Sequence, residues 1–419
     1  MAGATVGETV ELAITALAAG GDGVGRDAGG RVTFVPRTVP GDRVRVRIVH
    51  ATASFARAEL AELLEPSPAR VEPACAHFLE GCGGCAWQHV ARAEQLAAKQ
   101  AIVAGALRKL DGLVVHPIAD PAPPLGWRRR ARFHVEQGRT GLFALGTRRV
   151  LPIAACPQLE PALDAARAAV AGSTPPDGEL ALLGAPGPGE PVSPPEAPGG
   201  AAIAVGVERP WRGAAGLVGR AGIRGVIAGD AAHGEPILEL EPGLFAGPWD
   251  FAQASAAGNA ALIARVADAV GSPAPGAARM LELYAGGGNF TRALAAAGWD
   301  VVAGDTEVPP RPVPWRFERG TAADVLAREA GPFDAIVLDP PRAGAAEAID
   351  GILRHMPAAV VYVSCDAATL ARDAARLVAG GYRATDAWPI DLMPQTAHVE
   401  VVLRLIWSPR GAAGGEPPP

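Results

Sequence analysis

The sequence predicts an α/β protein in which a carboxy-terminal doubly wound parallel sheet follows two β-rich units. From about residue 251 onward, helical segments alternate with short buried strands, and this alternation is typical of a doubly wound sheet. Residues 8–66 contain short alternating strands separated by Gly and Pro-Gly turns, which favour a compact barrel. Strand-like pieces return at 125–250, so the 419 residues accommodate three units of ordinary size.

Composition limits the class of protein. Hydrophobic residues make up 49% of the chain and charged residues 20%, which excludes wholesale disorder. Five cysteines are too few and too clustered for a secreted disulfide scaffold. The first residues lack the basic and apolar regions of a signal peptide, and every apolar run is interrupted before the ~20 residues that span a bilayer. We therefore expect a cytoplasmic protein that does not enter a membrane.

The net charge of -6 is unevenly distributed. Residues 1–150 carry 19 basic and 14 acidic side chains, whereas residues 151–419 carry 19 and 30. Seven arginines lie between Trp127 and Val150 beside a single acid, Glu136. On a strand, part of this group could form a stripe that faces phosphates, and a solvated strand face in an Arg-rich chain is the equally simple alternative.

The remaining elements follow the hydrophobic pattern. The barrel strands are expected at 8–17, 31–39, 43–51 and 55–66. A helix is expected at 91–110, where it could pack on the carboxy-terminal unit. Six Pro and four Gly in Ala185–Gly200 predict an exposed loop. The predicted units are 1–66, 67–250 and 251–408, followed by a disordered tail at 409–419.

One crossover of the carboxy-terminal sheet should lack its helix. Residues 306–314 read TEVPPRPVP, and four prolines forbid a regular helix. Parallel neighbours are usually joined by a dozen or more residues that include a helix. We therefore expect an extended loop between Asp305 and Trp315.

Several candidate site residues follow strands of this sheet. A hydrophobic strand enters the glycine turn that begins at Gly286, and Asp305 ends the next strand, where a carboxylate can bind ribose hydroxyls. Glycine turns also serve NAD and FAD enzymes. The sequence Asp339-Pro-Pro-Arg342 then places another carboxylate at the carboxyl edge of the sheet, where doubly wound folds bind ligands. A purely structural proline turn is the alternative.

A cysteine reaches the same edge. Cys365 follows the buried run 360–364, and the alternative to a reactive thiol is a packed small hydrophobe. Glu400 begins a strong β-run near the carboxyl end of the chain. On their own, Glu400 would be a surface carboxylate and His398 a turn residue.

The other cysteines form a separate group. Three thiols in eleven residues, joined by one distant thiol, form a reasonable four-ligand set for an iron–sulfur cluster or a zinc ion; they are Cys75, Cys82, Cys85 and Cys156. The spacing alone does not distinguish these two metals. Reduced thiols without a ligand are a poor explanation for a sequence as compact as CGGC.

From about residue 8 to 407, the chain resembles the RNA uracil-C5 (5-methyluridine) methyltransferase family, in its TRAM-containing iron–sulfur 23S rRNA branch. The segments that carry the resemblance are CAHFLEGCGGCAWQH, WRRRARFHV, ACPQLEP, PWDFAQAS, LYAGGGNFT, LDPPRAG, VYVSCDAATLARD and PQTAHVEVV. The resemblance implies a Rossmann-like class I methyltransferase domain, an amino-terminal TRAM- or OB-like RNA-binding barrel, and a β-rich central iron–sulfur domain.

The resemblance also implies roles for individual residues. Cys365 would be the nucleophile and Glu400 the general base. Contacts to S-adenosylmethionine are implied for Gln253, Tyr284, Asn289, Asp305 and Asp339. A [4Fe–4S] cluster is implied on Cys75, Cys82, Cys85 and Cys156. The implied reaction methylates C5 of a specific uridine, which we expect in 23S rRNA, through a Cys365–C6 adduct. We expect the enzyme to act as a monomer.

The chain departs from the family pattern at five places, one of which is the proline-rich segment 306–314, where the family's next cofactor contact, normally an Asn, has no clear counterpart. Six residues separate the first two cysteines where five are usual, and Asp305 replaces a Glu. Ser255 replaces a frequent Asn, and Asp366-Ala367 replaces the usual Asn-Pro after the nucleophile.

Three alternative functions stay open. A tRNA 5-methyluridine methyltransferase would use the same chemistry. An RNA 5-methylcytosine methyltransferase typically has a second cysteine on the proline motif, and Asp339-Pro-Pro-Arg342 has none. A non-catalytic RNA-binding protein would not need Cys365 and Glu400. A radical role for the cluster is disfavoured because the C-x3-C-x2-C spacing is missing.

Overall fold

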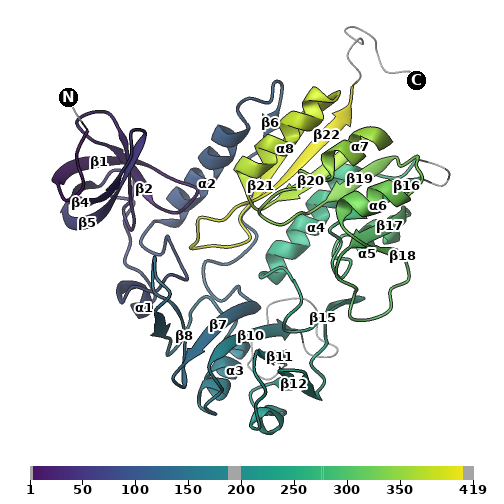
Figure 1. Ribbon diagram of the computed structural model, residues 1–419, viewed down its shortest axis with the longest axis horizontal. Helices are drawn as coiled ribbons and strands as arrows, with labels where there is room; N and C mark the ends of the chain where they lie inside the picture. Colours follow the sequence, from purple (N-terminus) through teal and green to yellow (C-terminus); the bar gives the residue numbers. More distant parts are fainter. Residues whose placement is uncertain (1–2, 187–199, 275, 277, 409–419) are drawn as a thin grey trace.

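The computed structural model describes residues 3–186, 200–274, 276 and 278–408 (Figure 1). The predicted tail at 409–419, and all but the ends of the predicted loop at 185–200, lie outside these residues. Three units surround the middle of the molecule: a barrel at the left of Figure 1, a sheet at the bottom, and a larger layered sheet at the upper right.

The amino-terminal unit is the small closed barrel that the sequence predicts. Its strands, in the order β1-β2-β3-β5-β4 around the barrel, are β1 (Thr9–Leu17), β2 (Gly23–Arg26), β3 (Val32–Val35), β4 (Arg43–Ala51) and β5 (Phe55–Glu65). Alternate residues of β4 fill the interior, including Val44, Val46 and Ile48. The outward-facing arginines of β4 are neutralised by glutamates of β1 and β5.

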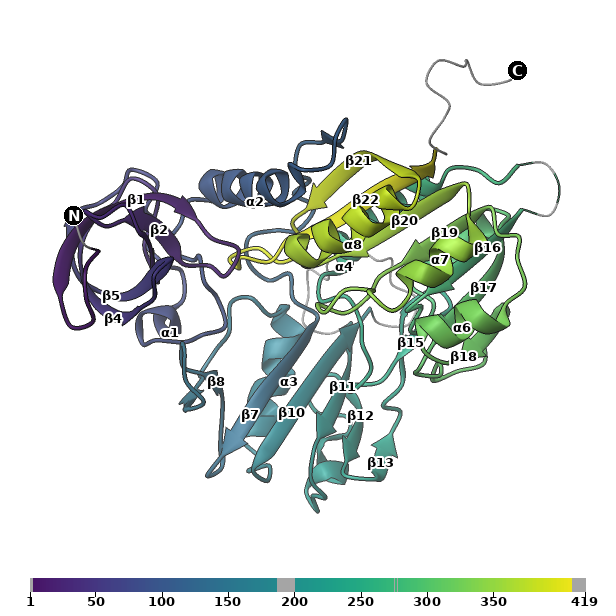
Figure 2. The same cartoon turned by 45° about the horizontal axis from the view of Figure 1, so that its top comes forward.

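The central unit is a mixed seven-stranded sheet in the order β13-β12-β11-β10-β7-β8-β9. Its strands are β7 (Arg130–Glu136), β8 (Arg139–Phe143), β9 (Val150–Pro152), β10 (Gly178–Ala185), β11 (Ala202–Val207), β12 (Ile223–Ala228) and β13 (Ala231–Gly234). The elements beside this sheet are α1 (Ala76–Leu79), α3 (Pro161–Ala171), the 3-10 helix η1 (Ala214–Leu217), and the hairpin β14 (Leu238–Glu241) and β15 (Leu244–Ala246). Figure 2 shows α3 along one face of this sheet, where it packs against β10 and β11.

The carboxy-terminal unit is the predicted doubly wound sheet, in the order β18-β17-β16-β19-β20-β22-β21-β6. Neighbours from β18 to β20 pair in parallel, and β22 is antiparallel to both of its neighbours. Its elements are α4 (Ala256–Val270), β16 (Arg279–Leu283), α5 (Thr291–Ala296), β17 (Asp300–Asp305), β18 (Arg316–Arg319), α6 (Ala322–Arg328), β19 (Ala335–Leu338), α7 (Ile349–His355), β20 (Ala359–Ser364), α8 (Ala367–Ala379), β21 (Tyr382–Ile390) and β22 (Glu400–Trp407).

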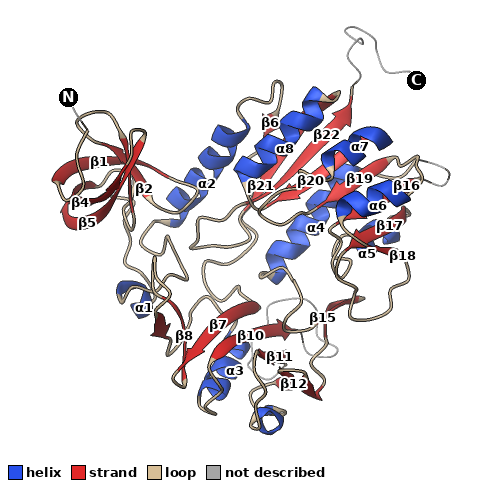
Figure 3. Ribbon diagram, viewed as in Figure 1, coloured by secondary structure: helices blue, strands red, loops and turns tan. Residues whose placement is uncertain are grey.

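Helices cover both faces of this sheet (Figure 3). Helices α4 and α5 contribute to the apolar core on one face, whereas α6, α7 and α8 contribute to the core on the other. Both faces are therefore buried, which explains why strands such as β19 read as uninterrupted apolar runs.

The amino-terminal half contributes to this sheet as well. Helix α2 (Arg92–Leu107) packs beside α8, and β6 (Val114–Val115) pairs in parallel with β21. Val103 and Leu107 are fully buried in the same core as α8. The helix ends three residues before the predicted Leu110, which is nevertheless buried in this core.

The shortened crossover is also present as predicted. Residues 306–315 join β17 to β18 without a helix. Trp315 takes over part of the missing packing, because its indole lies against the glycine turn at Gly288. A Cβ atom at Gly288 would be 2.2 Å from the Trp315 ring, and Gly288 has φ 89°, so this position requires glycine.

None of the helices in the described residues combines the length and the apolar character that crossing a membrane requires.

Candidate active site and cysteine cavity

The predicted active-site residues converge on the carboxyl edge of the parallel strands. Cys365 directly follows β20, and Asp339 directly follows β19. Glu400 is the first residue of β22, whose antiparallel direction brings its start to the same edge. Strand pairing fixes this arrangement, because Ser364 lies opposite Val401 and Ile390 lies opposite Glu400.

The three groups influence one another electrostatically. Burial raises the pKa of Cys365 to about 11, with further increases from Glu400 and Asp339. Burial also raises the pKa of Glu400 well above its usual value, and Asp339 adds to that effect. The pKa of Asp339 is raised to about 7 by burial. Perturbed acids and thiols gathered at one sheet edge are typical of a catalytic site.

A positive charge faces this group. Arg342 lowers the pKa values of Cys365 and Glu400, so it favours their charged forms. Its guanidinium donates a hydrogen bond to Nε2 of His398 at 3.0 Å. Burial, and then Arg342 itself, lowers the pKa of His398 to about 4, which leaves the imidazole neutral and able to accept that bond near neutral pH. The sequence around His398 indicates only a turn residue, so this contact with Arg342 could not be predicted from it.

Four of the five predicted cofactor residues line one pocket of about 50 Å³ beside the glycine turn; they are Gln253, Tyr284, Asn289 and Asp339. Tyr284 has φ 60° and donates its hydroxyl to Glu347 at 2.5 Å. The carboxylate of the fifth residue, Asp305, accepts a hydrogen bond from the backbone N–H of Gly286 at 2.8 Å. In this structure the Asp305 carboxylate therefore fixes the backbone of the glycine turn through this hydrogen bond.

A buried polar network that the sequence did not reveal holds Asn289. Its side-chain amide exchanges hydrogen bonds with Asn259 at 2.8 and 2.9 Å. Asn259 also donates to Glu241, and Arg129 and Arg292 pair with the same carboxylate. Glu241 therefore joins β14 of the central unit to the helices that flank the pocket. Its partners are 18 to 112 residues away, too distant for any local pattern to indicate.

The predicted stripe of arginines is divided in the structure. Arg129 is buried in the Glu241 network, and Arg128 lines the cysteine cavity, so neither forms part of an exposed stripe. Arg130 and Arg132 project from β7 beside the aromatic rings of Phe251 and Trp249. Phe251 is 70% exposed.

The other four cysteines surround a second cavity of about 80 Å³, between α1 and the edge of the central sheet. The cavity is lined by Cys75, Cys82, Cys85 and Cys156. Burial raises the pKa of the Cys82 and Cys156 thiols, and that of Cys85 to about 12. Two buried donors that line the cavity, Nε of Arg128 and Nε2 of Gln158, have no hydrogen-bond partner among the described residues.

The four cysteine thiols can be compared with the needs of a zinc ion and of an iron–sulfur cluster. Within the described ranges, no three His, Cys, Asp or Glu side chains are placed to hold a single metal ion. A zinc ion binds four ligands at about 2.3 Å from one point. A [4Fe–4S] cluster would instead be held by one thiolate from each of the four cysteines. Four thiols around one cavity, with a cation and unpaired donors beside them, fit such an anionic group.

Comparisons with known proteins agree with the architecture. Residues 3–61 match the TRAM domain family. A 23S rRNA (uracil(1939)-C(5))-methyltransferase from Chromohalobacter salexigens is 36% identical over 96% of this chain and 90% of its own length. An uncharacterised RNA methyltransferase from Gloeobacter violaceus is 33% identical over 95% of this chain and 96% of its own length.

A solved structure has the same fold. The tRNA (uracil-54, C5)-methyltransferase of Pyrococcus abyssi, in complex with S-adenosyl-L-homocysteine, superposes with a TM-score of 0.71. The superposition covers 94% of this chain and 99% of that one, at 21% identity. Because the two relatives that are 36% and 33% identical match nearly the whole chain, the chain belongs to the family of S-adenosylmethionine-dependent RNA (uracil-C5)-methyltransferases.

Proposed function

We propose that the protein methylates C5 of one uridine in 23S rRNA, with Cys365 as nucleophile and Glu400 as general base. The observation that carries this proposal is the placement of Cys365, Glu400 and Asp339 at one buried sheet edge beside the glycine-turn pocket. The 23S rRNA specificity is favoured because several relatives with that named substrate match over about nine-tenths of both chains.

The chemistry starts from the low reactivity of uracil. C5 is too weak a nucleophile to take a methyl group directly, so the Cys365 sulfur first adds to C6 as its proton leaves to water. The electron pair of the C5–C6 double bond moves into an enolate. C5 then attacks the sulfonium methyl, and the breaking carbon–sulfur bond leaves S-adenosylhomocysteine.

Release of the product requires a base. The methylated adduct still carries the C5 proton, and the Glu400 carboxylate removes it. The electrons of that C–H bond restore the C5–C6 double bond and expel the Cys365 thiolate. The raised pKa of Glu400 makes it a better proton acceptor than an ordinary glutamate once it is ionised, and Arg342 favours that ionised form.

We assign S-adenosylmethionine to the pocket of Gln253, Tyr284, Asn289 and Asp339. Asp305 contributes by holding the glycine turn and stays a candidate ribose contact. The reacting uridine has to leave its base stack to reach Cys365, which favours a loop or junction as the target. Phe251, exposed beside Arg130, offers a flat apolar surface and a cation near Gln253, and such pairs suit an unstacked nucleotide.

We also propose that Cys75, Cys82, Cys85 and Cys156 hold a [4Fe–4S] cluster. When bound, the cluster would cross-link α1, the following loop and Cys156, and Arg128 would offset its negative charge. The four thiols and the unpaired donors of the cavity support this assignment.

The decisive test is methyl transfer from tritiated S-adenosylmethionine to RNA of a strain that lacks the gene. The proposal predicts label in 23S rRNA, as 5-methyluridine at one position, and none in tRNA. Label confined to tRNA would favour the tRNA enzyme instead. Labelled 5-methylcytidine, or no transfer at all by the purified protein, would contradict the proposal.

A further inference from the structure

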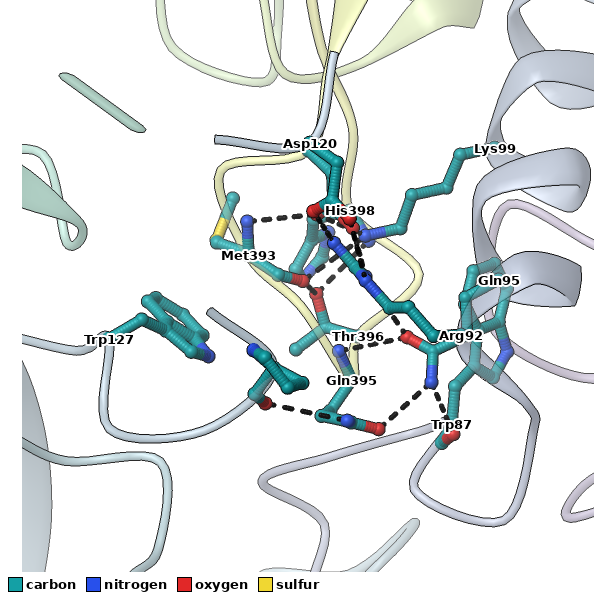
Figure 4. Close-up of polar contacts among 12 residues, drawn as sticks. Trp87, Arg92, Gln95, Lys99, Asp120, Trp127, Met393, Gln395, Thr396 and His398 are labelled. Atoms are coloured by element: carbon teal, nitrogen blue, oxygen red, sulfur yellow. Dashed lines mark hydrogen bonds and ion pairs between the residues drawn. The ribbon is translucent and has the colours of Figure 1, made fainter. Parts of the chain in front are cut away.

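The loop that leads into Glu400 is held by side chains from the other half of the molecule. Residues 391–399, which we call the base loop, connect β21 to β22 and end directly before Glu400. The start and the end of this loop lie together, because Ile390 is the strand partner of Glu400. Figure 4 shows Arg92, Gln95 and Lys99 of helix α2 directed toward the loop. A displacement at Asp391 would therefore be transmitted to Glu400.

The first anchor is a buried ion pair. Lys99 is completely buried, and its ammonium donates to Asp391 at 2.6 Å and to the carbonyl of Met393 at 3.2 Å. Arg92 binds the other oxygen of Asp391 at 2.5 Å and also pairs with Asp120. The backbone N–H of Asp391 donates to the carbonyl of Ala119 at 2.8 Å. The charges that meet here are thus two cations and two carboxylates.

The second anchor is a backbone conformation that a non-glycine residue rarely adopts. Gln395 has φ 65°. Its N–H donates to the side chain of Gln95 at 3.1 Å, and its carbonyl accepts from the N–H of Trp87 at 3.0 Å. Its side-chain oxygen accepts from Gln95 at 2.9 Å. Such conformations cost on the order of 1–3 kcal/mol and persist only where the surroundings determine them.

These two anchors cost folding free energy, so stabilising the fold alone does not explain them. Burying a lysine removes its charge from water, and burial lowers the pKa of Lys99 to about 8 even beside Asp391. Well-packed apolar side chains stabilise a protein as well as a buried ion pair does. Unlike apolar packing, an ion pair also fixes the orientation of the Asp391 carboxylate, and with it the position of the start of the base loop.

We propose that Lys99 and Gln395 are positioning residues for proton abstraction: together with Arg92 and Gln95 they fix the base loop so that Glu400 reaches the C5 proton of the methylated adduct. The inference rests on the role of Glu400 proposed above. Cys365 follows β20 and the glycine turn follows β16, and none of the hydrogen bonds described for the anchors reaches either one. The base loop also contains His398, which accepts from Arg342, so loosening the loop should slow proton abstraction most and the addition of Cys365 only slightly.

The experiment compares three variants of the full-length protein in single-turnover reactions with rRNA from a strain that lacks the gene. Lys99→Met removes the ammonium but keeps the length of the side chain. Gln395→Gly permits the positive φ but removes the contacts of the side chain with Gln95. Lys109→Met, at the exposed second lysine of the chain, is the matched control. Protein–RNA adduct that survives denaturation is measured beside methyl transfer and the melting temperature.

Lys99→Met and Gln395→Gly are expected to transfer methyl at nearly the wild-type rate in the first turnover. Release of methylated RNA should be about 10-fold to 100-fold slower, with adduct accumulating, because small misplacements of a catalytic group have effects of that size. Lys109→Met should behave as wild type. A purely structural role would lower the melting temperature and all steps together, without adduct.

Two results separate this inference from the proposed function. If Glu400→Gln itself accumulates no adduct, the role of Glu400 is wrong. If Glu400→Gln accumulates adduct but Gln395→Gly and Lys99→Met release RNA as fast as Lys109→Met, the positioning role is overturned while the proposed function stands. Should Lys99→Met fail to fold, Gln395→Gly alone decides the question.

Discussion

Cys365 directly follows β20 and Glu400 begins the antiparallel strand β22 beside it, and the Glu400 carboxylate adds to the raised pKa of the Cys365 thiol. In the proposed mechanism Cys365 forms the adduct and Glu400 resolves it, so the two residues should give opposite phenotypes. Cys365→Ala should form no covalent RNA complex, whereas Glu400→Gln should accumulate one after methyl transfer. Denaturing electrophoresis with labelled RNA measures both. Wild-type turnover by Cys365→Ala would contradict the mechanism.

The Glu241 network should couple the central unit to cofactor binding. Glu241→Gln leaves Arg129 and Arg292 without their carboxylate, and breaking a buried ion pair costs about 3–5 kcal/mol. We expect a lower melting temperature and weaker binding of S-adenosylmethionine, because Asn289 loses its support. Calorimetric titration measures the affinity. Glu239→Gln, on the same hairpin but exposed, is the control and should change neither.

Gly288 should tolerate no side chain. Gly288→Ala combines a positive φ with a Cβ atom 2.2 Å from Trp315, so we expect a loss of stability of about 1–3 kcal/mol or more. Chemical denaturation gives this value. Gly105→Ala, inside α2 with nothing within 4 Å of the added Cβ, should instead be neutral or slightly stabilising. Equal stability of the two variants would show that Trp315 moves away without cost.

The stability of the sheet should depend on pH through Glu282. Burial raises its pKa to about 8, and Thr291 donates a hydrogen bond to it. The folded state holds this proton up to about pH 8, whereas the unfolded chain releases it near the usual pKa of ~4.3, so stability is lost as pH rises between these values. Glu282→Gln cannot ionise and should gain melting temperature relative to wild type across that range. A constant difference at all pH values would contradict this assignment.

The cysteine cavity predicts iron dependence that is separable from catalysis. Cys85→Ser should lose iron and acid-labile sulfide, and its melting temperature should fall because the cross-link between α1 and Cys156 is lost. Cys365→Ala should retain the full iron content, since Cys365 lies at the other sheet. Zinc in place of iron in protein purified without oxygen would exclude the cluster.

Local sequence predicted the features that depend on neighbouring residues. The prolines of 306–314 excluded a helix and the hydrophobic runs placed Asp305 at the end of a strand, and both features appear in the structure. The fold class is confirmed by the TRAM match and the structural neighbour. The domain boundaries at 66, 250 and 408 stay predictions.

Contacts between residues far apart in the chain could not be predicted from the sequence. Lys99 and Asp391 are 292 positions apart, and nothing in the pattern around either residue indicates its partner. The arginines of β4 contribute to the basic surplus of the amino-terminal part of the chain, yet glutamates of neighbouring strands neutralise them. A count of charges along the sequence does not contain this pairing.

Helix α2 and β6 make the catalytic sheet discontinuous along the chain. During synthesis, the apolar face of α2, with Val103 and Leu107, emerges before the whole central sheet and long before its partners on α8 are available. The barrel and the central sheet have apolar cores of their own, so only α2 and β6 are without their partners until then, and an exposed apolar helix is prone to aggregation or to capture by chaperones. For the same reason, a fragment that begins at residue 251 would lack an edge strand and a covering helix.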